Sequence, residues 1–239
     1  MGNDLNSIGT LIQARVNSSR LPNKVFLPLA GRPMLGRVLD QHRSMRLAGT
    51  IVVVTSDTAA DDAIESFCRS EGVACFRGSE EDVLDRYYHA AQHYKLQIII
   101  RGTGDNPLVD PYLGDALVQD FIDKKVDYAT SKSVDVDSGL PDGVGLEVFS
   151  FNALEDAHYC GLKDHHREHI NEYILENPER FSISVFKPAF PGLVNTDIRL
   201  TVDTPGDLSR IQAIYDHFAN SRKEMDLATV VEYCRREAL

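Results

Sequence analysis

The chain of 239 residues carries 36 acidic and 25 basic side chains, a net charge of −11, and its hydrophobic fraction is 43%. These values are typical of a globular protein, and we expect one domain over residues 1–239 with residues 1–6 disordered. The acidic balance argues against nucleic acid as a partner, because nucleic-acid binding needs a broad basic surface. The longest apolar runs are too short to span a membrane, so we expect no membrane partner. Four scattered cysteines and no apparent signal peptide indicate reduced thiols in the cytoplasm.

The chain begins with an apolar run, Ile8–Ala14, that predicts a buried strand, and a polar loop follows it as far as Lys24. From Leu5 to Leu39 there is no acidic residue. The cations of this stretch are Arg15, Arg20, Lys24, Arg32 and Arg37. Because a cleft lined by one sign of charge attracts the opposite ion, and guanidinium and backbone N–H groups bind phosphate, this loop favours a polyphosphate site. A solvated surface loop is the alternative.

Strand and helix patterns alternate through the next part of the chain. We expect strands over 50–55, 73–76, 97–101 and 126–130. We expect helices from Pro33 to about Leu47, from caps at 56–58 to Gly72, over 83–91 and over 111–124. This alternation predicts the α/β class, with a mostly parallel central sheet, helices on both faces and right-handed crossovers.

The last hundred residues contain one long segment without periodicity. Residues 131–143 are rich in Asp, Ser, Gly and Pro and predict a mobile loop over a site. The strands expected after it cover 145–150, 181–187 and 197–202, and the expected helices cover 151–160, 164–176, 205–218 and 227–236.

Two aspartates stand at the ends of predicted strands. Asp105, in Gly102-Thr-Gly-Asp-Asn-Pro107, follows one of them, and Asp203 ends another. The first segment begins like a dinucleotide fingerprint, but Pro107 stands where the third glycine belongs, and no P-loop pattern occurs. Open α/β sheets bind ligands at the carboxyl ends of strands, and carboxylates opposite phosphates suit Mg²⁺. Helix capping is the alternative role for both.

Three other features of the sequence each allow more than one interpretation. His165-His-Arg-Glu-His169 matches the H-x-x-E-H pattern of zinc proteases, which short histidine-rich stretches also produce by chance. Glu147 lies inside an apolar strand, so it needs a partner or binds a polar substrate, and we favour the substrate. Residues 78–82 either cap the next helix or contact a nucleotide.

These motifs together resemble the cytidylyltransferases that make CMP-activated sugar acids, and most of all their spore-coat polysaccharide branch. The signature of that branch is approximately Q-A-R-x-x-S-x-R-L-P-x-K, and this chain reads Gln13-Ala-Arg-Val-Asn-Ser-Ser-Arg-Leu-Pro-Asn-Lys24. Further matching blocks lie in order at 76–86, 104–110, 147–150, 167–169 and 200–205. The resemblance implies a Rossmann-like nucleotidyltransferase fold, CTP as substrate, Mg²⁺ as cofactor and a homodimer.

The resemblance also implies roles for individual residues. Arg15, Arg20 and Lys24 would hold the β- and γ-phosphates and form the catalytic set with Asp105 and Asp203, which would hold magnesium. The implied nucleotide-binding residues are Gln13, Ala14, Arg15, Ser19, Arg20, Lys24, Arg77, Gly78, Ser79, Asp82, Gly104 and Asp105. The implied acceptor-binding residues are Asn106, Glu147, Arg167 and His169.

Two departures from the family leave the acceptor open. Gly102 stands where relatives often have Ile or Val, and 131–143 lacks the sugar-acid-binding pattern of the sialic acid and Kdo enzymes. We therefore predict in-line transfer of CMP from CTP to a small acidic or sugar-acid acceptor, with release of pyrophosphate, in surface polysaccharide or glycoconjugate precursor synthesis. A phosphate- or phosphonate-bearing acceptor is an alternative. A nucleotide-sugar glycosyltransferase, whose D-x-D motif Asp135-Val-Asp137 matches formally, and a non-catalytic nucleotide-binding regulator are the other hypotheses.

Overall fold

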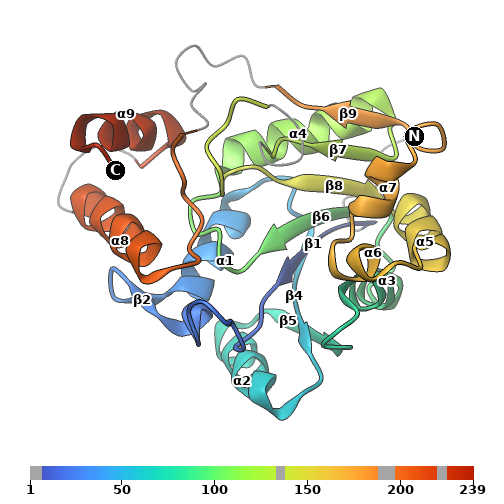
Figure 1. Cartoon of the computed structure of the whole chain (residues 1–239), viewed down its shortest axis with the longest axis horizontal. Helices are drawn as coiled ribbons and strands as arrows, with labels where there is room; N and C mark the ends of the chain where they lie inside the picture. The colour runs from blue at the N-terminus through green and yellow to red at the C-terminus, as the bar shows by residue number, and fades with distance from the viewer. Residues whose placement is uncertain (1–6, 133–137, 188–196, 220–224) are drawn as a thin grey trace.

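A computed structural model of the chain describes residues 7–132, 138–187, 197–219 and 225–239. The expected disorder of residues 1–6, the D-x-D match and most of the aperiodic segment's centre lie outside the described residues. Within those ranges, the chain forms a seven-stranded sheet with the order β5-β4-β1-β6-β8-β7-β9 (Figure 1). Its strands are β1 Ile8–Gln13, β4 Thr50–Ser56, β5 Ala74–Gly78, β6 Ile98–Thr103, β7 Tyr128–Thr130, β8 Glu147–Ser150 and β9 Ile183–Val185. A separate hairpin joins β2 Pro28–Leu29 to β3 Arg32–Pro33.

The sheet is mostly parallel, as the alternation of elements predicts. β1 pairs in parallel with β4 and β6, β4 with β5, and β7 with β9. β8 runs antiparallel between β6 and β7. The β-branched run Val52–Val54 is fully buried because helices cover both faces of the sheet at this point.

Side chains that alternate along the strands belong to different cores. Leu11 packs with α3 and α5 on one face, whereas Ile12 packs with α1 and α2 on the other, where α4 also lies. A further core joins α8 and α9, which lie together at one side of the sheet (Figure 1). These helices are α1 Met34–Ser44, α2 Asp62–Glu71, α3 Val83–His93, α4 Pro111–Lys124, α5 Phe151–Cys160, α8 Pro205–Ala219 and α9 Leu227–Glu237, with short 3₁₀ helices η2 Lys24–Phe26 and η3 Ala59–Asp61. Among the described helices, none combines the length and apolar character that crossing a bilayer requires.

Three predicted elements differ from the structure. The helix expected over 164–176 is two short helices, α6 Asp164–Glu168 and α7 Glu172–Glu176, because His169 between them has an extended backbone with φ −116° and ψ 100°. The strand expected over 181–187 is limited to β9.

The strand predicted over 197–202 is also wrong. Ile198, Leu200 and Val202 are buried and pack against α8 and α9, and Thr201 among them is buried as well. The backbone of this segment forms one isolated bridge, between Arg199 and Asp142, and is not part of the seven-stranded sheet. Apolar residues at alternating positions therefore occur here outside the sheet.

Gly102 on β6 lies against the buried ring of His42 from α1. A Cβ atom at position 102 would lie 2.7 Å from Nε2 of His42 and 3.1 Å from Cγ1 of Ile12. Burial lowers the pKa of His42 to about 4, so the ring is neutral at pH 7 and fills this space without a charge. The larger residue that relatives often have at this position has no room here.

We predict that Gly102→Val lowers the free energy of unfolding by about 1–3 kcal/mol, because overpacking forces neighbouring side chains to move. His42→Ala should reduce this cost, since it removes the atoms that a valine would meet. Urea unfolding of the two single variants and the double variant measures the coupling. An equal cost of Gly102→Val with and without the His42 ring would contradict the explanation.

Candidate active site

A cavity of about 240 Å³ opens where the chain leaves β1 and β6. The loop that follows β1 forms one wall, and the N–H of Gly104 donates to the carbonyl oxygen of Gln13 at 2.7 Å, so the two strand ends lie together. The structure brings the following residues of the sequence prediction to this cavity: Gln13, Ala14, Arg15, Ser19, Arg20, Lys24, Gly104, Asp105 and Asp203.

The backbone of the basic loop is held by Asp61, which the sequence analysis missed. One carboxylate oxygen of Asp61 accepts from the N–H of Val16 at 2.8 Å, and the other accepts from Thr55 Oγ1 at 2.8 Å and Ser56 Oγ at 2.6 Å. Burial alone would raise the pKa of Asp61, but the hydrogen bonds from Ser56, Val16 and Thr55 lower it. The loop therefore has a fixed backbone, and the side chain of Arg20 within it is 62% exposed.

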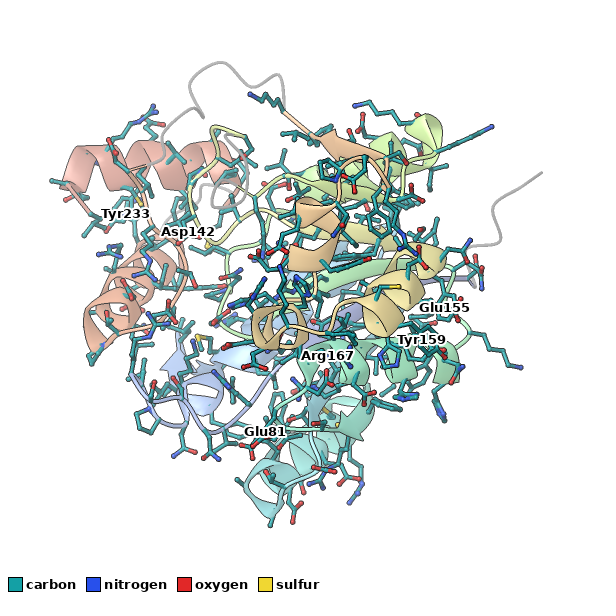
Figure 2. All side chains as sticks on the ribbon, turned by 45° about the vertical axis from the view of Figure 1, so that its right-hand side comes forward. Glu81, Asp142, Glu155, Tyr159, Arg167 and Tyr233 are labelled. Carbon is teal, nitrogen blue, oxygen red and sulfur yellow. The ribbon has the colours of Figure 1, made fainter. Side chains whose placement is uncertain are left out.

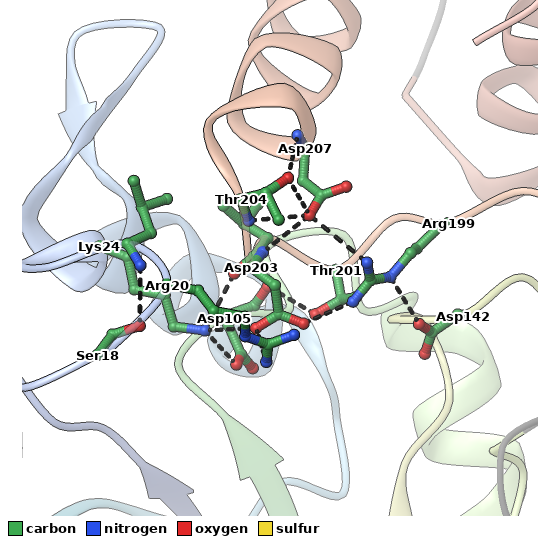
Figure 3. Close-up of polar contacts among 12 residues, drawn as sticks. Ser18, Arg20, Lys24, Asp105, Asp142, Arg199, Thr201, Asp203, Thr204 and Asp207 are labelled. Carbon is green, nitrogen blue, oxygen red and sulfur yellow. Dashed lines mark hydrogen bonds and ion pairs between the residues drawn. The ribbon is translucent and has the colours of Figure 1, made fainter.

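Lys24 lies between two carboxylates. Its Nζ atom is 2.7 Å from Oδ2 of Asp105 and 3.0 Å from Oδ1 of Asp203, and it donates to the carbonyl oxygen of Val202 at 3.0 Å (Figure 3). Burial favours the neutral form of Asp105, but the Lys24 ammonium outweighs it and lowers the pKa of this carboxyl group. Arg20 and Arg199 also pair with Asp203. Both predicted metal-binding carboxylates thus face one cation.

Asp207, in the first turn of α8, fixes the backbone that carries Asp203. Its Oδ2 atom accepts from the N–H groups of Asp203 at 3.1 Å and Thr204 at 2.9 Å, and Thr204 Oγ1 accepts from the N–H of Asp207 at 3.2 Å (Figure 3). This reciprocal cap begins the helix. The spacing Thr204-Pro-Gly-Asp207 is a sequence signal for it.

A second cavity of about 390 Å³ adjoins the first, and Arg101, Asp105, His169 and Asp203 line both. Arg101 and Lys132 line the second cavity and share the fully buried carboxylate of Glu147. Arg101 Nη1 and Lys132 Nζ lie 2.9 Å and 2.7 Å from Oε2 of Glu147. The hydroxyl of Tyr128 donates to Oε1 at 2.8 Å. Glu147 therefore positions two cations at the cavity.

The partnership of Glu147 and Arg101 follows from strand register. These residues lie opposite each other on the antiparallel strands β8 and β6. Burial alone would raise the pKa of Glu147, but the charges of Arg101 and Lys132 lower it to about 2. Arg101 interrupts an apolar strand just as Glu147 does, so the two charged residues of opposite sign are a sequence signal for a buried ion pair.

Of the other predicted acceptor residues, Asn106 and His169 line the cavities and Arg167 does not. Asn106 lines the second cavity, and its Oδ1 atom is buried without a hydrogen-bond partner among the described residues. His169 is exposed where the two cavities meet. Arg167, which is labelled in Figure 2, lines neither of them. Its Nε and Nη1 atoms donate to Oδ2 of Asp82 at 2.8 Å and to the carbonyl oxygen of His158 at 2.7 Å.

The predicted nucleotide-binding residues of the 77–82 segment lie away from both cavities. Arg77 donates to the carbonyl oxygens of Ser56 at 3.1 Å and Thr58 at 2.7 Å, and Gly78 lines a separate cavity beside α3. Ser79 accepts from the N–H of Asp82, which in turn caps α3. The structure therefore shows residues 79–82 capping α3. Val83, the residue that follows them, lines the first cavity.

The histidines of the H-x-x-E-H pattern do not form the pair that a zinc protease needs. His165 lies 2.6 Å from Glu176, whereas His169 lines the cavities. His166 Nδ1 accepts from the N–H of Lys163 at 3.4 Å, so its Nε2 carries the proton and donates to Glu176 at 3.0 Å. The cluster joins α6 to α7.

Comparison with known families decides the assignment of the chain. Residues 10–232 match the family model described as Cytidylyltransferase. The chain belongs to the cytidylyltransferase family. It is 34% identical over 237 residues to the spore coat polysaccharide biosynthesis protein SpsF of Bacillus subtilis, covering 97% of this chain and 95% of that protein.

Two solved structures support the same fold. A cytidylyltransferase from Leptospira borgpetersenii is 30% identical, with a TM-score of 0.88 over 97% of this chain and 95% of that one. A CMP:2-keto-3-deoxy-manno-octonic acid synthetase in complex with CTP is 19% identical, with a TM-score of 0.68 over 89% of this chain and 99% of that one. The expected Rossmann-like nucleotidyltransferase fold is confirmed.

We predict that Glu147→Gln lowers the free energy of unfolding at pH 7 by about 3–5 kcal/mol, because it leaves the buried Arg101 and the half-buried Lys132 without their carboxylate. The folded-state pKa of Glu147 is depressed from 4.5 to about 2, so its contribution is full above pH 4.5 and is lost as the pH falls toward 2.

Urea unfolding of both proteins at pH 7.0, 4.5 and 3.5 measures this difference, and it should shrink only at the lowest pH. Glu81→Gln, at an exposed position, is the matched control and should change stability by less than about 0.5 kcal/mol. A difference that is small at pH 7 or independent of pH would contradict the role of Glu147.

Proposed function

We propose that this cytidylyltransferase transfers CMP from CTP to a small acidic or sugar-acid acceptor and releases pyrophosphate, in the synthesis of a surface polysaccharide or glycoconjugate precursor. One observation carries the proposal: a basic loop faces the carboxylates of Asp105 and Asp203 where two cavities meet. The first cavity offers Arg15, Arg20 and Lys24 to a triphosphate, and the second offers space for an acceptor. The similarity to SpsF supports the biosynthetic setting.

The proposal assigns Mg²⁺ to Asp105 and Asp203. Two observations support it: both residues are carboxylates, and one ammonium group lies 2.7 Å and 3.0 Å from an oxygen of each. When bound there, Mg²⁺ would supply positive charge to the phosphate oxygens.

The side chains of this protein would act by position and charge. Arg15, Arg20 and Lys24 would bind the β- and γ-phosphates and neutralise the charge that grows on the departing pyrophosphate. An acceptor oxygen would attack the α-phosphorus from the second cavity. The new P–O bond would form as the bond to pyrophosphate breaks, and no covalent enzyme intermediate is needed.

The second cavity offers cations to an anionic acceptor. Arg101, Lys132 and Arg199 line it together with Asp105, Asp142, Glu172 and Asp203, and Arg101 and Lys132 share the single carboxylate of Glu147. The amide oxygen of Asn106, which has no hydrogen-bond partner among the described residues, can accept from a hydroxyl. A sugar acid satisfies both the cations and the amide oxygen, and a phosphate- or phosphonate-bearing molecule satisfies the cations. Membership of the cytidylyltransferase family argues against the glycosyltransferase hypothesis.

CTP with Mg²⁺ should stabilise the protein against unfolding, and ATP, GTP, UTP and a UDP-sugar should stabilise it less. A ligand at about 100 times its dissociation constant adds about 2.7 kcal/mol of stability. Asp105→Asn should lose the magnesium-dependent part of the shift, whereas Asp156→Asn, in an exposed pair with Arg180, should keep it. Thermal unfolding with each nucleotide, with and without Mg²⁺, measures these shifts. No shift with CTP in the wild type would overturn the proposal.

Arg20→Met should slow pyrophosphate release by about 10²–10³-fold, because it removes one group that stabilises the transition-state charge. Release from CTP is measured with a panel of sugar acids that begins with 3-deoxy-manno-octulosonate. Arg69→Met removes an exposed guanidinium elsewhere, on α2, where the side chain is 78% exposed, and should leave the rate unchanged. Equal rates for the Arg20 and Arg69 variants would show that Arg20 has no catalytic part.

A further inference from the structure

The carboxylates proposed to hold Mg²⁺ are already neutralised by side chains. Lys24 pairs with both Asp105 and Asp203, and Arg20 and Arg199 pair with Asp203. Arg199 also pairs with Asp142 and Asp207, so its charge is shared among three carboxylates. Lys24 and Arg20 by themselves balance the two charges of Asp105 and Asp203. The attraction of these carboxylates for a divalent cation that approaches alone is therefore largely cancelled.

Lys24 is bound as completely as an ammonium group can be. It has three N–H donors, and its three acceptors are Asp105 Oδ2, Asp203 Oδ1 and the carbonyl oxygen of Val202, at 2.7, 3.0 and 3.0 Å. Its side chain is 11% exposed, in contrast to 62% for Arg20. No acceptor is missing from this arrangement, so Lys24 leaves it only for a stronger partner.

We infer that Lys24 holds the place of the divalent cation in the free protein and gives it up when a triphosphate enters, so that nucleotide must bind before the metal or together with it. This inference rests on the proposed function, since CTP is the triphosphate. The structure supports it by placing the same ammonium on the carboxylates and on the wall of the first cavity, beside Arg15 and Ser19.

The triphosphate is the partner that can move Lys24. Its oxygens carry several negative charges, and they would lie against the loop from which Lys24 projects, so the ammonium can exchange carboxylate for phosphate acceptors. Arg20, which pairs with Asp203, can likewise exchange its carboxylate acceptor for phosphate oxygens. Asp105 and Asp203 would then lose the positive charges of Lys24 and Arg20, and the metal ion of the metal–nucleotide complex would replace them. A metal ion alone offers Lys24 no new acceptor.

The test is the binding of Mn²⁺ to the nucleotide-free protein, measured by electron paramagnetic resonance of the unbound ion. The wild type should bind Mn²⁺ weakly, and Lys24→Gln should bind it at least about tenfold more tightly, because one repelling unit charge a few ångströms away is removed. Adding Asp105→Asn to Lys24→Gln should abolish the gain, which locates the ion. Arg69→Gln, which removes an exposed charge elsewhere, should behave as the wild type.

A separate titration distinguishes this inference from the proposed function. Calorimetry of the wild type with the non-hydrolysable analogue CMPCPP, in EDTA and then in Mg²⁺, shows whether the cavity takes the nucleotide. Binding of the analogue together with equal Mn²⁺ affinities for wild type and Lys24→Gln would overturn the inference alone. No binding of the analogue in either buffer would overturn both.

If circular dichroism shows that Lys24→Gln does not fold, the wild-type protein alone can test the inference. Relaxation of water protons by Mn²⁺ then compares the protein with and without CMPCPP. The inference requires that bound Mn²⁺ is detected only with the analogue. Equally tight Mn²⁺ binding in the absence of the analogue would overturn it.

Discussion

The contact of Lys24 with Asp105 and Asp203 is the interaction on which the site depends. These residues come from the loop after β1, the end of β6 and the segment before α8, so one ammonium group joins three distant parts of the chain. Buried charges are costly unless each has its partners, and here all three ammonium hydrogens have acceptors. The carboxylates lie in one place because the cation between them offsets their repulsion.

Three carboxylates that do not line either cavity of the site hold the surrounding residues in position. Asp61 holds the backbone of the basic loop, Asp207 holds that of Asp203, and Glu147 holds the cations of the second cavity. Each accepts several hydrogen bonds or ion pairs within a buried or partly buried setting. Part of the acidic composition of the chain thus serves to orient residues that line the two cavities.

The sequence predicted most of the fold, since buried β-branched runs such as Val52–Val54 and capped amphipathic helices are local patterns. It also predicted the end of the strand β6 that Asp105 follows, whereas Asp203 follows a segment that is not a strand. It failed where a pattern has more than one three-dimensional outcome. Residues 197–202 have apolar side chains at alternating positions yet form one isolated bridge, and the extended backbone of His169 separates α6 from α7. The contacts of Arg77 could not be predicted either, because only the structure shows which backbone carbonyl oxygens accept from its guanidinium group.

The reversed direction of β8 has a consequence for how this family can vary. Because β8 is antiparallel to β6, its first residue, Glu147, lies beside the ligand-facing end of β6, and Arg101 is its direct neighbour. A strand can accept new side chains, but gain or loss of one residue exchanges its two faces. Such a change would carry Glu147 away from Arg101 and Lys132 together. Length, more than identity, is therefore the conserved property to look for between Gly145 and Ser150 when more distant relatives are aligned.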